Sequence, residues 1–177
     1  NSQTLKLSTW TFQTLHNPTK VVPVVPAPSK ANMSRKCLAL DLDETLVHSS
    51  FQYVSQADYR IPVKIDGQVH DVFVIKRPGV DEFLTRMAAK YEIFIFTASL
   101  SKYANPLLDR LDTSRVISHR LFRENCVFSQ GSFVKDLAFI GRPLDQTIIV
   151  DNSAQSFRFH PQNAIGCSSF IDDPSDV

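Results

Sequence analysis

Two aspartates that directly follow an apolar segment are the residues of this chain best suited to do chemistry. An apolar run from Cys37 to Leu40 is followed by Asp41 and Asp43, with one leucine between them. Side chains alternate faces in an extended chain, so the two carboxylates project to the same side, roughly 7 Å apart. Like charges this close repel each other unless a cation lies between them or one carboxyl holds a proton. The pattern therefore predicts a metal site or an acid/base pair.

The sequence argues against two simpler interpretations of this acidic pair. A solvated strand end is the plain alternative, but a second apolar run, Thr147 to Val150, also ends in an acid, Asp151. An EF-hand loop starting at Asp41 would need Gly at its sixth position and Glu at its twelfth, where the chain has Leu46 and Gln52. Two buried strands that both end in acids are typical of an open α/β sheet, which binds ligands beyond the carboxyl ends of its strands.

Composition excludes several classes of protein. A chain of 177 residues is long enough for one ordinary domain. Its net charge of +1 is far from the excess of basic residues that is typical of a nucleic-acid-binding protein. The three cysteines, Cys37, Cys126 and Cys167, show no C-x-x-C spacing, and none has the arginine six positions later that a cysteine-based phosphatase needs. No apolar segment approaches the roughly 18 residues that span a bilayer, and no glycine-rich nucleotide-binding motif occurs. We expect free cysteines and no direct contact with nucleic acid.

A small β insert is predicted beside the acidic strand end. Alternating apolar residues between Tyr59 and Ile75 flank Asp66-Gly67, a dipeptide that strongly favours a two-residue hairpin turn. The insert, about residues 53–76, would form one wall of the site. A second hairpin is predicted just before Lys135 and would deliver that cation.

The rest of the chain alternates predicted helices and strands. Pro78-Gly79 opens a helix whose apolar residues recur at helical spacing. A strand over Tyr91 to Phe96, a helix over Ser101 to Leu111, a strand over Ile117 to Phe122 and the strand ending at Asp151 follow. Repeated strand and helix with apolar strands are typical of a parallel sheet. We therefore predict an α/β fold, a Rossmann-like parallel sheet with helices on both faces.

The two ends of the chain are expected to differ from the middle. Residues 1–34 contain four prolines, which favour an extended tail or linker that does not join the core. The domain is predicted over residues 35–177. Residues 172–177 resemble the opening of a helix with Ser175 as its cap, and we expect that helix itself to be missing from the chain.

Four motifs, in order, resemble those of a known enzyme family. Asp41-Leu42-Asp43-Glu44-Thr45 is similar to the Asp-x-Asp-x-Thr signature of the haloacid dehalogenase superfamily. From about residue 35 to the end, the chain resembles the small FCP/SCP-like phosphatases that act on the C-terminal domain of RNA polymerase II. The further motifs are Phe96-Thr97-Ala98-Ser99, Phe133-Val134-Lys135-Asp136-Leu137 and Asp151-Asn152-Ser153.

The resemblance implies a haloacid dehalogenase-like fold and a protein serine/threonine phosphatase. Asp41 would be the nucleophile that forms an aspartyl-phosphate, and Asp43 would be the general acid and then the base. Lys135 would neutralise Asp41 and the phosphoryl oxygens, and Thr97 would donate a hydrogen bond to the same oxygens. Thr45 also belongs to these motifs.

The resemblance also implies a cofactor, Mg2+. Its ligands would be Asp41, the main-chain carbonyl of Asp43, and Asn152, with Asp151 orienting a bound water. Ser99 is a further motif residue without an assigned role.

In the small phosphatases, the matching positions form a pocket for a substrate proline. We therefore expect a phosphoprotein partner, with phosphoserine in an extended, proline-containing peptide such as the C-terminal domain of RNA polymerase II. The predicted substrate-binding residues are Phe51, Val63, Ile65, Val72, Leu100, Tyr103 and Arg123.

Two alternatives stay open from the resemblance. Membrane-associated relatives apply the same chemistry to stress-signalling proteins or lipid-synthesis enzymes. Other relatives are non-catalytic protein-import receptors that have lost the motif aspartates. Asp41, Asp43, Lys135 and Asp151 are intact here, which favours an enzyme. We expect a nuclear or cytoplasmic protein, with a membrane reached only through a partner or an N-terminal region outside this sequence.

Overall fold

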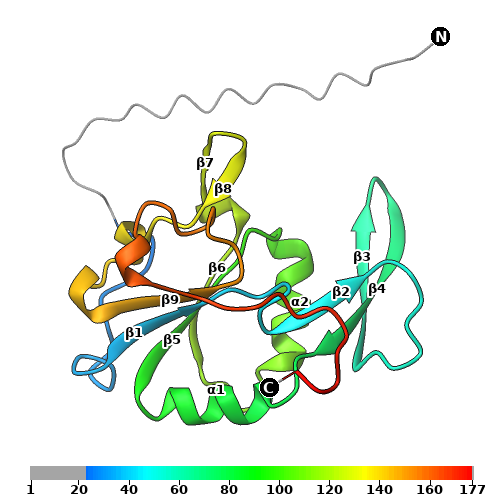
Figure 1. Ribbon diagram of the computed structural model, residues 1–177, viewed down its shortest axis with the longest axis horizontal. Helices are drawn as coiled ribbons and strands as arrows, with labels where there is room; N and C mark the ends of the chain where they lie inside the picture. The colour runs from blue at the N-terminus through cyan, green and yellow to red at the C-terminus, as the bar shows by residue number, and fades with distance from the viewer. Residues whose placement is uncertain (1–22, 177) are drawn as a thin grey trace.

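A five-stranded parallel sheet forms the centre of the protein in the computed structural model, which describes residues 23–176 (Figure 1). The strand order is β10-β9-β1-β5-β6, and each neighbouring pair is parallel. The carboxyl ends of the strands therefore meet at one edge, as the sequence predicted. The strands are β1 (Lys36–Leu40), β5 (Tyr91–Phe96), β6 (Ile117–Leu121), β9 (Thr147–Asp151) and β10 (Ala164–Gly166).

The two faces of the sheet are covered differently. On one face, side chains such as Leu40 pack against α1 (Val80–Ala88) and α2 (Ser101–Leu111). On the other, side chains such as Phe94 pack against the 3-10 helix η2 (Leu137–Ile140). Helices thus lie on both faces, but within residues 23–176 both α-helices share one face. The alternation of side chains along each strand buries both sets, which explains the continuous apolar runs in the sequence.

The insert forms a separate three-stranded antiparallel sheet, which stands to one side of the parallel sheet in Figure 1. Its order is β2-β4-β3, from β2 (Val47–Ser50), β3 (Tyr59–Ile65) and β4 (Gln68–Lys76). Asp66 and Gly67 have φ of 48° and 83°, which fits the two-residue hairpin turn predicted there. The sequence did not predict β2, because three of its four residues are polar.

The remaining elements are short. A two-stranded hairpin leads to Lys135, as predicted, and four 3-10 helices lie in the connections between Pro23 and Asp176. Runs this short carry too few residues for a periodic pattern, so the 3-10 helices were not predicted. The hairpin strands are β7 (Val127–Ser129) and β8 (Ser132–Val134), and the further 3-10 helices are η1 (Arg123–Asn125), η3 (Leu144–Gln146) and η4 (Pro161–Asn163).

The segment just before β1 is attached to the domain. Val24 donates its amide hydrogen to the carbonyl of Phe139 at 2.9 Å, and Arg142 donates to the carbonyl of Pro26 at 3.0 Å. Val25 packs against the core on the same side. Residues 23–34 therefore join the domain surface, in contrast to the tail predicted over 1–34, whose first 22 residues lie outside the described part of the chain.

The last described residues form no helix. Asp173 accepts hydrogen bonds from the amide and the hydroxyl of Ser175, so the aspartate caps this turn instead of the predicted serine. Asp176 forms an ion pair with Arg77, 2.6 Å from its Nε. Across residues 23–176, no helix has the length and apolarity needed to cross a membrane.

Candidate active site

A buried lysine joins two carboxylates at the carboxyl edge of the sheet. Lys135 Nζ lies 2.5 Å from Asp41 Oδ1 and 2.5 Å from Asp151 Oδ2. Asp41 directly follows β1 and Asp151 ends the neighbouring strand β9, while the β7–β8 hairpin delivers the lysine. All three side chains are buried, and buried charges persist in proteins when they are paired in this way. The three groups together carry one net negative charge.

The electrostatics keep this lysine positively charged. Burial alone would lower the pKa of Lys135, but Asp41 and Asp151 outweigh burial and raise the pKa. Burial raises the pKa of Asp151, and the positive charge of Lys135 opposes that rise. A fixed positive charge therefore lies beside Asp41, where an anionic substrate group would approach.

Oxygen atoms gather around the second carboxylate oxygen of Asp41. Thr45 Oγ1 donates to Asp41 Oδ2 at 2.8 Å and lies 3.5 Å from Asn152 Oδ1. The amide nitrogen of Asn152 donates to Ser169 Oγ at 2.9 Å, which leaves the amide oxygen on the side of Thr45. Carboxylate and amide oxygens are the ligands that small, hard divalent cations prefer.

The set of ligands expected for such a cation is compatible with this arrangement. Within residues 23–176, no three His, Cys, Asp or Glu side chains lie close enough together to bind a metal ion by themselves. The expected set uses one carboxylate side chain, from Asp41, together with the Asn152 amide and the Asp43 main-chain carbonyl. The proximity of Asp41 Oδ2 and Asn152 Oδ1, both within reach of one hydroxyl, supports this smaller set.

The carboxylate of Asp43 has neutral partners instead of a lysine. Ser99 Oγ donates to Oδ2 at 2.7 Å, Thr97 Oγ1 lies 3.4 Å from the same oxygen, and Tyr103 OH donates to Oδ1 at 3.0 Å. Burial raises the pKa of Asp43, and the hydrogen bond from Ser99 only partly offsets that rise. Asp43 therefore holds a proton at higher pH than an exposed aspartate does, as a general acid requires.

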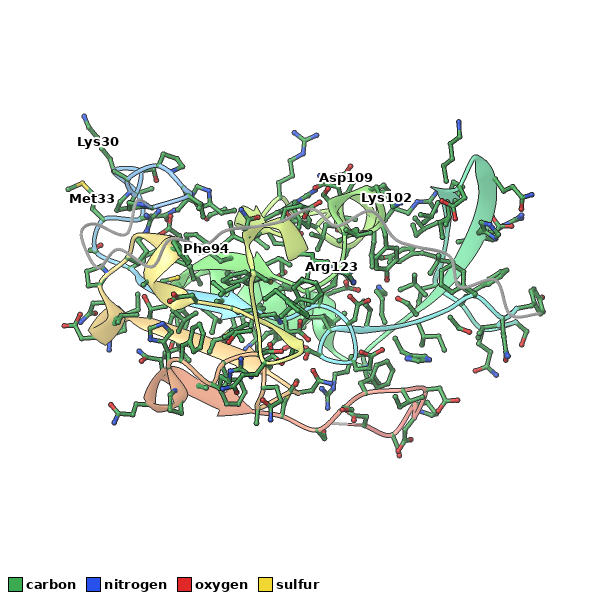
Figure 2. All side chains as sticks on the ribbon, turned by 90° about the horizontal axis from the view of Figure 1, so that it is seen from above. Lys30, Met33, Phe94, Lys102, Asp109 and Arg123 are labelled. Atoms are coloured by element: carbon green, nitrogen blue, oxygen red, sulfur yellow. The ribbon has the colours of Figure 1, made fainter. Side chains whose placement is uncertain are left out.

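An apolar pocket of about 260 Å³ lies next to Asp43 and is lined by Tyr103 and Ser99. Val63 on β3 is buried, whereas 64% of Phe51 is exposed at the rim. Arg123 and Lys102, both labelled in Figure 2, add two positive charges. All seven residues predicted to bind substrate line this pocket: Phe51, Val63, Ile65, Val72, Leu100, Tyr103 and Arg123.

Arg123 is held in place from two sides. Its Nε donates to the carbonyl of Ala98 at 2.6 Å, and its guanidinium lies over the ring of Phe133 at 4.9 Å from the centroid. A guanidinium fixed in this way loses little conformational freedom when a ligand binds.

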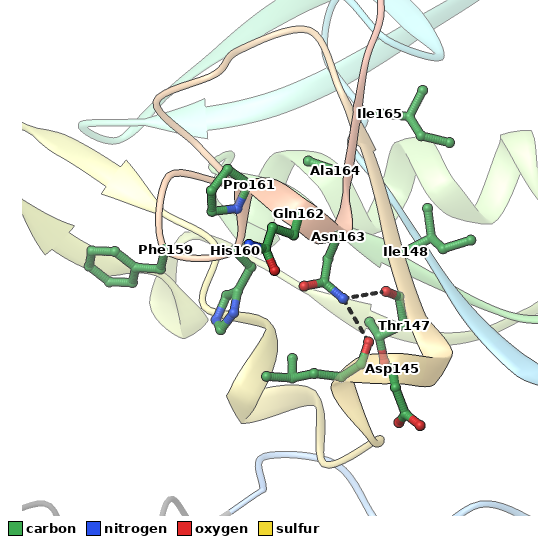
Figure 3. A pocket seen from close by; sticks show the side chains of 11 residues that line it. Asp145, Thr147, Ile148, Phe159, His160, Pro161, Gln162, Asn163, Ala164 and Ile165 are labelled. Carbon is green, nitrogen blue, oxygen red and sulfur yellow. Dashed lines mark hydrogen bonds between the residues drawn. The ribbon is translucent and has the colours of Figure 1, made fainter.

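A larger, more open hollow of about 880 Å³ lies elsewhere, where β9 and β10 begin (Figure 3). Asn163 spans its floor and donates to the carbonyls of Leu144 and Thr147 at 2.6 and 2.9 Å. Since Asp41 follows the opposite end of the neighbouring strand, this hollow is separate from the carboxylates. Size alone therefore does not identify the site in this protein.

Two contacts of the site were not predicted. Tyr103 was assigned to the apolar pocket, but its hydroxyl also bonds Asp43. Arg77 was assigned no role, yet it donates to the carbonyl of Thr45 at 3.1 Å and so supports the loop that holds Asp41. The available signal for the first contact was that Tyr103 lies in the first turn of α2, only four residues after Ser99.

The family profile and the similar proteins agree on one family of phosphatases. The profile described as NLI interacting factor-like phosphatase matches residues 36–177. The chain is 52% identical over 166 residues to the mouse CTD small phosphatase-like protein, covering 89% of this chain and 60% of that protein. It is 51% identical over 154 residues to the human carboxy-terminal domain RNA polymerase II polypeptide A small phosphatase 2, covering 87% and 57%.

A yeast relative has a much longer chain. The chain is 55% identical over 153 residues to phosphatase PSR1 of Saccharomyces cerevisiae, covering 86% of this chain and 36% of that protein. Across these three relatives, the chain spans between 36% and 60% of the relative's length.

Solved structures support the fold. The structure of Fcp1, an essential RNA polymerase II CTD phosphatase, matches 77% of this chain and 42% of its own with a TM-score of 0.64 at 19% identity. A fission yeast Fcp1 variant bound to beryllium fluoride covers the same shares with a TM-score of 0.61 at 18% identity. These two structural matches confirm the predicted α/β fold of the haloacid dehalogenase type.

Proposed function

The chain belongs to the NLI interacting factor-like phosphatase family, and from this membership we propose that it is a Mg2+-dependent protein serine/threonine phosphatase that forms an aspartyl-phosphate. The observation that carries the proposal is the contrast between two neighbouring carboxylates. Asp41 contacts the buried cation of Lys135, whereas Asp43 contacts hydroxyl groups. One carboxylate thus has a cation beside it, which suits a nucleophile, and the other can hold a proton as an acid.

In the first step, an oxygen of Asp41 attacks phosphorus in line with the leaving group. The bond from phosphorus to the substrate oxygen breaks, and that oxygen takes the proton of Asp43 and leaves as an alcohol. Lys135 offsets the negative charge of the phosphoryl oxygens, and Thr97 donates its hydroxyl to them. The products are the dephosphorylated protein and a phosphorylated Asp41.

In the second step, Asp43 acts as a base. It takes a proton from water while the water oxygen attacks phosphorus, and the bond between phosphorus and Asp41 breaks. Inorganic phosphate leaves, Asp41 is again a carboxylate, and Asp43 again holds its proton. The mixed anhydride of the intermediate hydrolyses more easily than the original ester.

Asp41, the main-chain carbonyl of Asp43, and Asn152 would hold the magnesium ion, with Asp151 orienting a water of its shell. When bound, the ion supplies positive charge that offsets the charge of the transferring phosphoryl group. The fold serves this chemistry because β1 and β9 are neighbours, which brings Asp41 and Asn152 to one place.

We further propose that the substrate is phosphoserine in an extended, proline-containing peptide, such as the C-terminal domain of RNA polymerase II. The names of relatives about half identical to this chain support that class of substrate. The apolar pocket beside Asp43 supports it as well, because a proline ring needs an apolar wall. We expect no direct contact with nucleic acid, and a membrane would be reached only through a partner or an N-terminal region beyond this sequence.

Substitution of the nucleophile tests the proposal. Asp41→Asn is expected to lower hydrolysis of p-nitrophenyl phosphate by at least about a thousandfold, since an amide neither attacks phosphorus well nor holds the cation. The matched control is Asp109→Asn, because Asp109 on α2 is exposed and pairs with Arg120 on β6. EDTA should abolish turnover and added Mg2+ should restore it. Retained activity in Asp41→Asn, or full activity in EDTA, would contradict the proposal.

A further inference from the structure

The carboxylate of Asp43 is held from two sides by hydroxyl groups that follow β5. Ser99 Oγ donates to Oδ2 at 2.7 Å, and Thr97 Oγ1 lies 3.4 Å from the same oxygen. Tyr103 OH donates to the other oxygen, Oδ1, at 3.0 Å. Since each carboxylate oxygen has a donor, the plane of this carboxylate is fixed relative to the start of α2.

Tyr103 connects this carboxylate to the apolar pocket. Its ring lines the pocket beside Leu100 and Val63, while its hydroxyl bonds both Asp43 and the hydroxyl of Ser49. Packing alone would be served equally well by phenylalanine, so the two polar partners of this hydroxyl indicate a role beyond packing.

We propose that Tyr103 is a positioning residue for proton transfer: its hydroxyl orients Asp43 toward the leaving oxygen, and its ring forms part of the pocket that receives the peptide. The inference rests on the proposed function, because it takes Asp43 as the general acid. A substrate side chain that fills the pocket packs against the ring and restricts its motion. Recognition of the peptide is thereby tied to the geometry of the acid.

The step concerned moves one proton. As Asp41 bonds to phosphorus, the leaving oxygen takes the proton of Asp43, and Asp43 becomes a carboxylate. Tyr103 and Ser99 donate hydrogen bonds to this carboxylate as its charge appears, which favours the transfer. A p-nitrophenolate leaves readily without a proton, whereas phenolate and the serine alkoxide do not. Poor orientation of Asp43 should therefore slow poor leaving groups most.

The test compares leaving groups in Tyr103→Phe, which keeps the ring and removes the hydroxyl. We expect kcat/KM for phenyl phosphate and for a phosphoserine peptide to fall about tenfold more than kcat/KM for p-nitrophenyl phosphate, because kcat/KM reports the step in which the leaving group departs. The matched control is Tyr59→Phe, because the hydroxyl of Tyr59 bonds the carbonyl of Arg110 and not Asp43. Equal falls for both aryl phosphates in Tyr103→Phe, or no fall for either, would overturn the inference.

Pocket variants separate positioning from peptide binding. Val63→Trp fills the pocket, and Phe51→Ala removes a rim residue that is too exposed for its loss to open a cavity in the core. Each is expected to lower kcat/KM for the peptide about tenfold relative to the aryl phosphates. The ratio between the two aryl phosphates should be kept in Phe51→Ala, which leaves the pocket open beside Tyr103. A changed aryl ratio in Phe51→Ala would show that packing alone moves the readout and would refute the role of the hydroxyl.

Asp43→Asn distinguishes failure of this inference from failure of the proposed function. If this variant lowers kcat/KM for phenyl phosphate no more than kcat/KM for p-nitrophenyl phosphate, Asp43 is not the general acid, and both proposals fail, because kcat/KM reports the step in which the leaving group departs. If Asp43→Asn discriminates between the leaving groups and Tyr103→Phe does not, the proposed function stands and only the role of Tyr103 is wrong.

Discussion

At the scale of single residues, two aspartates separated by one leucine have different surroundings. Asp41 contacts Lys135 and Thr45, so a full positive charge lies against one of its oxygens. Asp43 contacts Ser99 and Tyr103, which are neutral donors. Burial raises the pKa of Asp43, while Asp41 lies against a cation, and this difference is how one site supplies both a nucleophile and an acid.

The pKa of Asp43 predicts how activity depends on pH. Because burial raises this pKa, the protonated acid persists to higher pH than in a free aspartate, and activity should fall as pH rises through the raised pKa. The attack on phosphorus needs Asp41 as a carboxylate, so activity should not extend into strong acid. We expect an optimum on the acid side of neutrality in a pH profile of kcat/KM with a phosphoserine peptide. A rate still rising at about pH 9 would contradict these roles.

The sequence predicted the functional residues that belong to a motif. It did not predict the hydrogen bonds between residues that only the folded structure brings together. Asp41 and Asp43 follow from their spacing, and Lys135 follows from the resemblance of its motif. The bond from Tyr103 to Asp43 crosses 60 positions of sequence, and the bond from Arg77 to Thr45 crosses 32. Contacts across such separations depend on how β5, α2 and β4 pack, which no local pattern encodes.

At the scale of elements, the two ends of the sheet serve different purposes. The carboxyl ends hold the candidate active site. Near the amino ends, Glu92 at the start of β5 pairs with Arg142 at 2.7 Å, and both side chains are at most 5% exposed. Asn32, from the segment before β1, also donates to Glu92 at 3.3 Å. This buried ion pair connects the sheet to the segments that cover its second face.

Breaking the pair should cost stability. Glu92→Gln is expected to lower the free energy of unfolding by about 3 kcal/mol, because the buried guanidinium of Arg142 loses its counter-charge. The matched control is Glu82→Gln on α1, whose pair with Arg86 is about three-quarters exposed at both ends and should contribute under about 0.5 kcal/mol. Urea denaturation of both variants measures the difference. Similar values for the two variants would show that the buried pair has no structural role.

The sequence predicted the helices and strands whose apolar residues recur at regular spacing. It did not predict the short elements. The helix predicted over Ser101 to Leu111 and the strand over Tyr91 to Phe96 coincide with α2 and β5. The three-residue strand β10 was missed because two of its residues, Ala164 and Gly166, give no apolar alternation. Its pairing with β9 depends on tertiary structure, as is usual for a short edge strand.

At the scale of the whole molecule, two sheets cooperate at one place. The parallel sheet supplies Asp41 and Asp151 from strand ends, the antiparallel sheet supplies Val63 to the pocket wall, and the loop after β2 supplies Phe51. Tyr103 on α2 contacts both parts, since its ring lines the pocket and its hydroxyl bonds Asp43. The parallel sheet is thus suited to the chemistry common to phosphoryl esters, and the insert to the choice of substrate.

The most direct test of this account is to trap the covalent intermediate. Asp43→Asn should slow hydrolysis of the intermediate, because the base that activates water is lost. After acid quenching during turnover of p-nitrophenyl phosphate, mass spectrometry should find one added phosphoryl group on the peptide that contains Asp41, and hydroxylamine should remove it. The same variant with Asp41→Asn added is the control and should carry no phosphoryl group. A phosphoryl group on another residue, or none on a variant that still turns over, would contradict the account.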